Sequence, residues 1–194
     1  MFRLTPVVRN LIIINVVVFL LQQIAGITQF VSLFPIGSGY FAPYQFFTYM
    51  FAHGGIGHIF FNMFALASFA PILESYWGDK KFLFFYLATG IGAAVIYAGV
   101  HYFIMPGSGG MMLGASGALY GVLMAFGLLF PNMEIMLLFP PIPIKAKYMV
   151  FLIGFLTFVM DRSGSVAHLA HFGGALVAVI IIQVWKSQGT GGRY

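Results

Sequence analysis

The sequence predicts an all-α membrane protein, a bundle of six transmembrane helices in a single domain over residues 1–194. Of the 194 residues, 61% are hydrophobic and 7% are charged, and the mean hydropathy is +0.98. So few charges could not cover the surface of a soluble domain of this length. Apolar stretches long enough to cross a hydrocarbon core of about 30 Å also recur along the chain. Composition and segment length therefore both indicate a membrane protein.

Six apolar segments are separated by stretches rich in glycine and proline. The segments are Val7 to Ala25, Ile56 to Trp77, Phe82 to Phe103, Leu113 to Phe130, Tyr148 to Met160 and Val166 to Trp185. The first follows basic residues, as the apolar part of a signal peptide does. It is long enough to span and no small-x-small cleavage site follows it, so we expect a retained helix.

The basic residues indicate the orientation of the six segments. Eight of the nine lie on one side of a six-span arrangement, and Arg162 alone lies on the other. The eight are Arg3, Arg9, Lys80, Lys81, Lys145, Lys147, Lys186 and Arg193. By the positive-inside rule both termini are cytoplasmic. We expect a multi-pass protein of the bacterial inner (plasma) membrane.

Polar residues inside three segments lie at a common depth. Asn62, Ser116 and His171 come 15, 14 and 14 residues before the cytoplasmic ends of the second, fourth and sixth segments. At 1.5 Å per residue, each lies about 21–23 Å above that interface and about 7–9 Å below the outer one. His58 is one turn from Asn62 on the same helix face. Because polar groups at this depth are costly unless they are partnered or hydrated, we expect a cavity that opens outward.

The chemistry available at this level is limited. The chain has no cysteine and four carboxylates, and acyl transfer by Ser116 with His171 as its base is the leading option. The carboxylates are Glu74, Asp79 and Glu134 toward the cytoplasmic side and Asp161 in an outer loop. None is placed to orient His171, which predicts a Ser–His dyad. His58, Asn62 and the backbone N–H of Ser116 could donate to the oxyanion of a tetrahedral intermediate.

Three motifs surround these residues. The chain has Gly114-Ala115-Ser116-Gly117 on the fourth segment, His58-x-x-x-Asn62 on the second and Ala170-His171-x-Gly173 on the sixth. A Gly-x-Ser-Gly sequence alone is a weak signal in a chain with 24 glycines. In this order and at this depth, the three together resemble the rhomboid family of intramembrane proteases, of the prokaryotic six-helix type.

The resemblance implies a role for each matching position. Ser116 and His171 correspond to the catalytic dyad, and His58 and Asn62 to residues that assist the oxyanion. Tyr120, one turn after the serine, corresponds to an aromatic residue that packs on the catalytic histidine. The resemblance implies the fold of a rhomboid-like bundle for essentially the whole chain.

Small residues predict a close approach of the fourth and sixth segments. Gly117 and Gly121 on one, with Gly174 and Ala178 on the other, form small-xxx-small pairs. Gly114 and Gly117 flank the serine and support its position. One departure from the family concerns the anchoring of the first outer loop, where the chain has Tyr44-Gln45 and some members have Trp-Arg.

Other interpretations predict different patterns. A metal site made of His53, His58, His168 and His171 would lack a carboxylate to complete it, and no metal or organic cofactor is expected. His168, one turn before His171, is the alternative base. A transporter would show repeat symmetry and polar groups across the whole bilayer. An inactive relative would lack the serine or the histidine.

The preferred prediction is therefore an intramembrane serine endopeptidase. Its substrates would be transmembrane segments of other membrane proteins, cut near the outer leaflet. Its partners would be these substrates and the lipid bilayer, and no nucleic acid is expected because the charge excess of +5 is small.

Overall fold

Helices make up most of the structure, a computed structural model that describes residues 4–136, 142–160 and 165–189. The longer helices are α1 (Pro6–Ala25), α4 (Ile56–Trp77), α5 (Asp79–Gly99), α6 (Ser116–Leu129), α7 (Ala146–Met160) and α8 (Ser165–Ser187). The shorter elements are α2 (Thr28–Val31), α3 (Gln45–Thr48), a 3-10 turn (Tyr49–Phe51), a π-helical turn (Val100–Ile104) and the antiparallel strands β1 (Glu134–Met136) and β2 (Pro143–Lys145).

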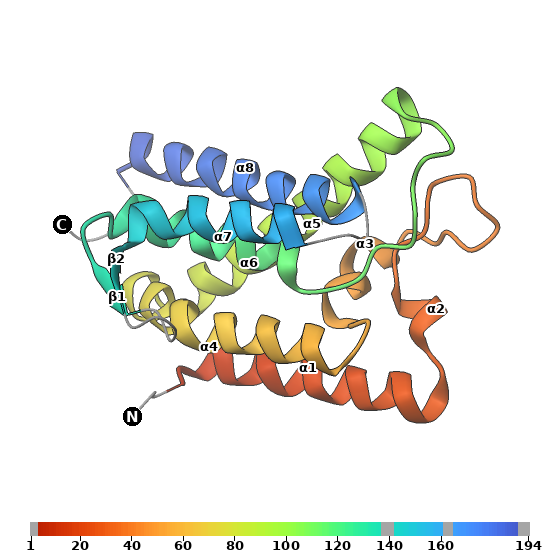
Figure 1. Ribbon diagram of the computed structural model, residues 1–194, viewed down its shortest axis with the longest axis horizontal. Coiled ribbons are helices and arrows are strands. Elements are labelled where there is room, and N and C mark those ends of the chain that lie inside the picture. The colour runs from red at the N-terminus through yellow and green to blue at the C-terminus, as the bar shows by residue number, and fades with distance from the viewer. Residues whose placement is uncertain (1–3, 137–141, 161–164, 190–194) are drawn as a thin grey trace.

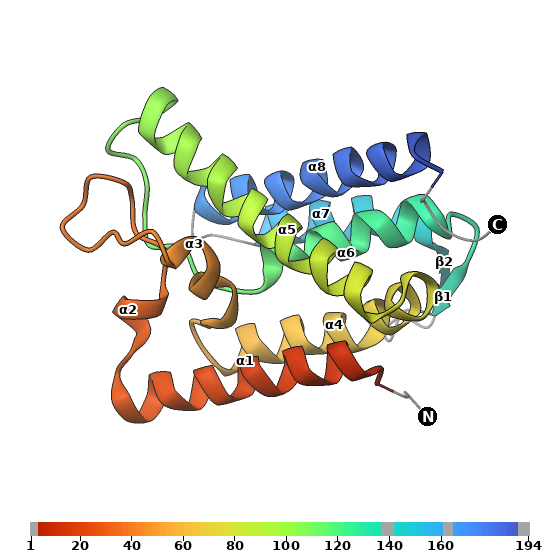
Figure 2. The same cartoon turned by 180° about the vertical axis from the view of Figure 1, so that it is seen from behind.

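The longer helices form a bundle around α6. In Figure 1 α1 packs beside α4, and α6 lies between α4 and the pair α7 and α8. Figure 2 shows α5 crossing the other side of α6 and α8 at an angle. Ten of the 14 residues of α6 are buried, so neighbouring helices separate α6 from the surroundings of the bundle.

The predicted fold class, an all-α membrane bundle, is confirmed. Four described helices are long and apolar enough to cross a membrane: Pro6–Ala25, Ile56–Trp77, Asp79–Ile104 and His168–Ser187. The second matches its predicted bounds to the residue. With 14 and 15 residues, α6 and α7 are shorter, and the count of six spans stays a prediction. The β1–β2 hairpin between them was not predicted.

The predicted start of the fourth segment at Leu113 is wrong, because α6 begins at Ser116. Gly114 has a φ of 121°, which residues with a Cβ rarely adopt and which a helix cannot contain. Its N–H donates to the carbonyl of Tyr49 at 2.9 Å and not to a helical partner. Ser116 is therefore the first residue of the helix and not an interior one.

A buried amide anchors the loop that follows α2, which the sequence predicts to be the first outer loop. The Oε1 atom of Gln45 accepts from the N–H groups of Phe34 and Ala42, both at 3.2 Å, and its Nε2 donates to the carbonyl of Tyr40 at 2.9 Å. Gln45 is 1% exposed. The glutamine thus satisfies three backbone groups of the loop.

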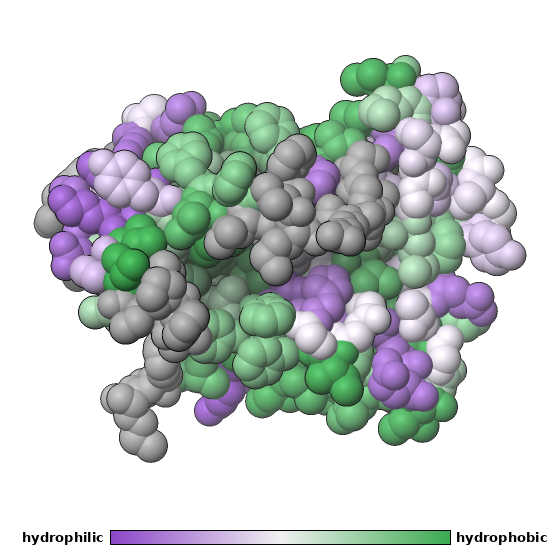
Figure 3. Space-filling model, in the orientation of Figure 1, coloured by the Kyte–Doolittle hydropathy of each residue, from purple (hydrophilic) through white to green (hydrophobic). Residues whose placement is uncertain are grey.

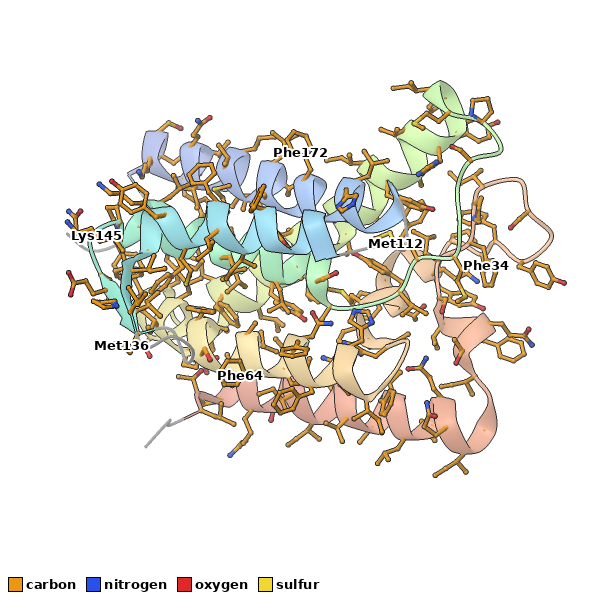
Figure 4. All side chains as sticks on the ribbon, viewed as in Figure 1. Phe34, Phe64, Met112, Met136, Lys145 and Phe172 are labelled. Carbon is orange, nitrogen blue, oxygen red and sulfur yellow. The ribbon has the colours of Figure 1, made fainter. Side chains whose placement is uncertain are left out.

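The same loop also holds the segment that leads into α6. Leu33 and Met112 exchange two backbone hydrogen bonds, at 2.9 and 2.8 Å. Figure 4 labels Phe34 and Met112 at this junction. The residues before Ser116 are therefore fixed by the first third of the chain, and the start of α6 does not depend on helix propensity alone.

The start of α1 and the end of α8 lie at the end of the bundle that carries the β1–β2 hairpin (Figure 1). Lys145 and Met136 mark this end in Figure 4. Hydrophobic side chains cover much of the middle of the face shown in Figure 3, and hydrophilic ones gather toward the ends. Arg3, Arg162 and Arg193 lie outside the described residues. The orientation of the bundle in a membrane stays a prediction.

A buried carboxylate joins α1 to α4 near that end. Glu74, 1% exposed, accepts from the hydroxyl of Thr5 and from the N–H groups of Val7 and Val8 at 2.9 Å. The first N–H groups of a helix lack partners within it, and a negative charge there complements the helix dipole. Glu74 therefore caps α1 from a neighbouring helix.

Candidate active site

Ser116 lies at the amino end of α6, where backbone donors are available. The first N–H groups of an α-helix have no partner within it. The residue before the helix is Ala115, whose methyl side chain cannot accept a hydrogen bond from these groups. The positive end of the helix dipole lies here too, which favours a negatively charged group. The half-buried Ser116 thus combines a hydroxyl with an N–H at a site suited to an anion.

Glycines bring α5, α6 and α8 together just inside this end. A Cβ at Gly174 would overlap the backbone carbonyl of Gly117. A Cβ at Gly121 would lie 2.7 Å from the Cβ of Thr89, and one at Gly173 would lie 3.2 Å from the Cα of Ala93. The predicted close approach of the two helices is present at Gly117 and Gly174.

The imidazole of His171 lies against the α6 face that carries Ser116. It stacks on the ring of Tyr120, with 4.1 Å between centroids and 12° between planes. Tyr120 follows Ser116 by four residues, so the two side chains share one face of α6. The Tyr120 hydroxyl donates to the carbonyl of Ile153 on α7 at 3.4 Å. Phe172, the next residue of α8, points away from this contact and is 64% exposed (Figure 4).

The ring of His58 approaches the loop just before Ser116. A Cβ at Gly114 would lie 2.8 Å from both Cε1 and Nε2 of His58, and 3.8 Å from Oγ of Ser116. A Cβ at position 114 would therefore force the imidazole to move. The N–H of Gly54 donates to Nδ1 of His58 at 3.3 Å, so the neutral ring carries its hydrogen on Nε2. That hydrogen lies on the ring edge nearest Gly114, in the loop that leads to Ser116.

Asn62 lies one turn along α4 from His58 and is 7% exposed. Its Nδ2 donates to the carbonyl of His58 at 3.0 Å. The amide carries two hydrogens, so this bond leaves the second for another acceptor. In Figure 3, a small hydrophilic patch interrupts the hydrophobic middle of the face, over the region between α4 and α7.

A second buried histidine lies behind His58. The two rings are 5.1 Å apart at 68°, and His53 is 2% exposed. Burial and the neighbouring His58 lower the pKa of His53 to about 4, which keeps its ring neutral at pH 7. Gln22 of α1 binds both the N–H and the carbonyl of His53. Sequence reasoning gave Gln22 no role, although an amide inside an apolar span is itself a signal.

The remaining predicted histidine, His168, is half-buried on α8, one turn before His171. In the ranges that the structure describes, no three histidine, aspartate or glutamate side chains are grouped so that they could hold a metal ion. The structure thus stacks Tyr120 on His171 and places the ring of His58 beside Gly114, two residues before Ser116. It does not assemble the four-histidine metal site.

Comparison with known proteins identifies this arrangement of helices and motifs. A family model described as the Rhomboid domain matches residues 40–187. The chain belongs to the rhomboid family. The match covers α4, α6 and α8 and includes all three motifs, and the predicted family is confirmed.

Several curated relatives are rhomboid proteins of organelles. The chain is 32% identical to rhomboid protein 1, mitochondrial, of Saccharomyces cerevisiae over 133 residues, which are 67% of this chain and 38% of the yeast protein. It is 30% identical over 192 residues to RHOMBOID-like protein 12, mitochondrial, of Arabidopsis thaliana, covering 90% of this chain and 56% of the relative. It is 29% identical over 157 residues to the human presenilin-associated rhomboid-like protein, mitochondrial, covering 71% and 38%.

This rhomboid chain thus spans between 38% and 56% of the length of these relatives. The similarity establishes a membrane protein of the rhomboid family.

Proposed function

We propose that this chain is an intramembrane serine endopeptidase, with Ser116 as nucleophile and His171 as general base. The observation that carries the proposal is the stacking of His171 on Tyr120, 4.1 Å between ring centroids. It holds an imidazole against the helix face that begins with the serine. The close packing of Gly117 and Gly174 supports the same pairing, because a close approach of the two backbones lets a short side chain such as serine reach a partner on the other helix.

The proposed reaction is acyl transfer to Ser116 followed by hydrolysis. The hydroxyl attacks the substrate carbonyl while His171 takes its proton. The resulting oxyanion would receive hydrogen bonds from the Ser116 N–H, from Nε2 of His58 and from the Asn62 amide. His171 then protonates the leaving amine as the C–N bond breaks. Water, deprotonated by His171, then attacks the acyl carbon, and His171 returns that proton to the Ser116 oxygen as the acyl–oxygen bond breaks. The cycle therefore needs no metal or organic cofactor.

The proposed substrates are transmembrane segments of other membrane proteins, cut toward the outer leaflet. A peptide bond inside a helix is shielded, so the segment must unwind locally before attack. Glycine, serine or proline near the bond lowers that cost. Lateral access past α7 is supported by Phe151 and Phe155, which are 74% and 64% exposed. Phe158 lies outside the described side chains, and most of the Asp161–Ser165 outer loop lies outside the described residues.

We also propose that the protein lies in a bacterial inner membrane with both termini in the cytoplasm. The start of α1 and the end of α8 lie at the end of the bundle that carries Lys145, which supports this orientation. Reporter fusions at residues 1 and 194 test it. Both fusions should report a cytoplasmic position, and a periplasmic signal from either would reverse the assignment.

The decisive experiment measures cleavage of a reporter transmembrane protein in liposomes. Ser116→Ala and His171→Ala should each lower the rate by at least about 10³-fold, since members of a catalytic unit fail together. Ser68→Ala is the matched control, because the Ser68 hydroxyl donates to the carbonyl of Phe64 within its own helix. It should cleave like the wild type. Turnover by Ser116→Ala at the wild-type rate would end the proposal.

His168 is tested beside His171 because the two lie three residues apart on α8. His171→Ala should be inactive and should not react with a fluorophosphonate probe. His168→Ala should keep measurable cleavage and probe labelling. The opposite result would make His168 the base. His58→Ala and Asn62→Ala should each lower the rate by about 10²–10³-fold, the usual effect of removing one oxyanion donor.

A further inference from the structure

We propose that Gln22, on α1, is a positioning residue for the oxyanion side of the site. It acts through the peptide group between His53 and Gly54 on the ring of His58. The inference rests on the proposed role of His58 as an oxyanion donor. It extends the functional unit to a helix that carries none of the three motifs.

Both ends of the Gln22 amide are used. Oε1 accepts from the N–H of His53 at 2.8 Å, and Nε2 donates to the carbonyl of His53 at 3.2 Å and to the hydroxyl of Thr28 at 3.1 Å. Gln22 is 5% exposed and His53 is 2% exposed, so water competes little for these bonds. An apolar side chain at position 22 would leave buried backbone groups unsatisfied, which is costly.

The hydrogen bonds of Gln22 to the backbone of His53, called the clamp below, act on His58 through one planar peptide group. The carbonyl of His53 and the N–H of Gly54 belong to the same peptide group, which is rigid and trans. Gln22 binds the carbonyl of that group, and its N–H donates to Nδ1 of His58 at 3.3 Å. Rotation of the peptide plane would break both bonds together. By holding the carbonyl, Gln22 therefore fixes the direction of the N–H that faces the imidazole.

The bond to Nδ1 decides which nitrogen of His58 can serve the oxyanion. A neutral imidazole that accepts at Nδ1 carries its hydrogen on Nε2. The Nε2 edge is the one that lies 2.8 Å from the Cβ position of Gly114, beside the loop that leads to Ser116. The ring of His53, 5.1 Å away at 68°, supports the imidazole from behind. Without the clamp, the ring of His58 could adopt either neutral tautomer, and its Nε2–H would no longer be held in one direction.

Gln22→Met tests the clamp, because methionine has a similar length and makes no strong hydrogen bond. It should lower kcat for reporter cleavage by about 10- to 100-fold with KM unchanged, since misplacing a catalytic group by about 1 Å costs up to about 10² in rate. Asn15→Leu is the matched control. Asn15 is also a buried amide of α1, and its Nδ2 donates to Leu11 and not to the backbone groups of His53. Asn15→Leu should keep kcat within about threefold of the wild type.

A double-mutant cycle separates positioning from general loss of structure. If Gln22 acts through His58, Gln22→Met should change the rate of the His58→Ala enzyme by less than about twofold. A purely structural role would lower the rate by the same factor in both backgrounds, and that result would overturn the proposal.

The tautomer can be measured without any cleavage, from the ¹⁵N shifts of the His58 ring in the full-length protein in lipid. The wild type and Asn15→Leu should show the Nε2–H form, and Gln22→Met should show a mixture of both tautomers. If the wild type fails to cleave but the two tautomer patterns are as expected, the clamp proposal stands and the protease proposal fails. If the wild type cleaves and Gln22→Met matches it in rate and tautomer, the clamp proposal is wrong.

Discussion

Gly174→Ala perturbs the contact on which the proposed dyad depends. The added Cβ would overlap the carbonyl of Gly117, a backbone atom that cannot rotate away. To restore an ordinary contact of about 3.5 Å, α6 and α8 must separate by on the order of 1 Å. Overpacking of this kind lowers the free energy of unfolding by about 1–3 kcal/mol. The same displacement moves His171 relative to Ser116 and should lower the cleavage rate by about 10²-fold.

The assay pairs reporter cleavage in liposomes with thermal unfolding in the same lipid. Gly99→Ala is the control, since a Cβ at Gly99 would meet nothing within 4 Å. It should cleave like the wild type and be as stable or slightly more stable, because alanine favours a helix over glycine. Wild-type cleavage and unfolding temperature in Gly174→Ala would refute the idea that backbone contact between α6 and α8 sets the geometry of the dyad.

Three further predictions follow from individual contacts. Glu74→Gln should lower the free energy of unfolding by about 1–3 kcal/mol, because the new NH₂ group cannot accept from the backbone donors of α1. Tyr120→Phe keeps the ring on His171 and should cleave within about threefold of the wild type. Tyr120→Leu should lose about 10-fold, the equivalent of one aromatic contact. Because the fold lowers the pKa of His53 to about 4, the His53 ring binds a proton more readily in the unfolded chain than in the folded one. Stability should therefore fall from about pH 6.5 toward pH 4, and less steeply in His53→Phe.

The bounds of the long helices could be predicted because the bilayer makes local demands on the sequence. Every backbone group must be satisfied within its own segment, so a run of apolar residues is itself a signal. The second segment, Ile56 to Trp77, was predicted to the residue, and the first differs from α1 by one residue at its start. The motif positions on the three helices were also readable, since they depend on residue type and spacing alone.

The start of α6 could not be predicted in this way. The sequence from Leu113 onward is apolar enough to be helical, but Gly114 bonds to Tyr49 and turns into the left-handed region. This contact joins residues 65 positions apart, so no local pattern reports it. Its effect is to place Ser116 at the helix end, where its backbone N–H has no helical partner.

The supporting contacts of the site likewise belong to the tertiary structure. Gln22 is a single amide in an apolar segment, and hydropathy cannot tell which of the distant backbone groups it binds. Hydropathy and motif spacing are properties of neighbours along the chain, and they determined the class, the spans and the residue types available for chemistry. Which edge of His58 faces the serine loop, and what holds it there, depends on how packed helices place backbone groups far apart in sequence, and only the folded structure decides that.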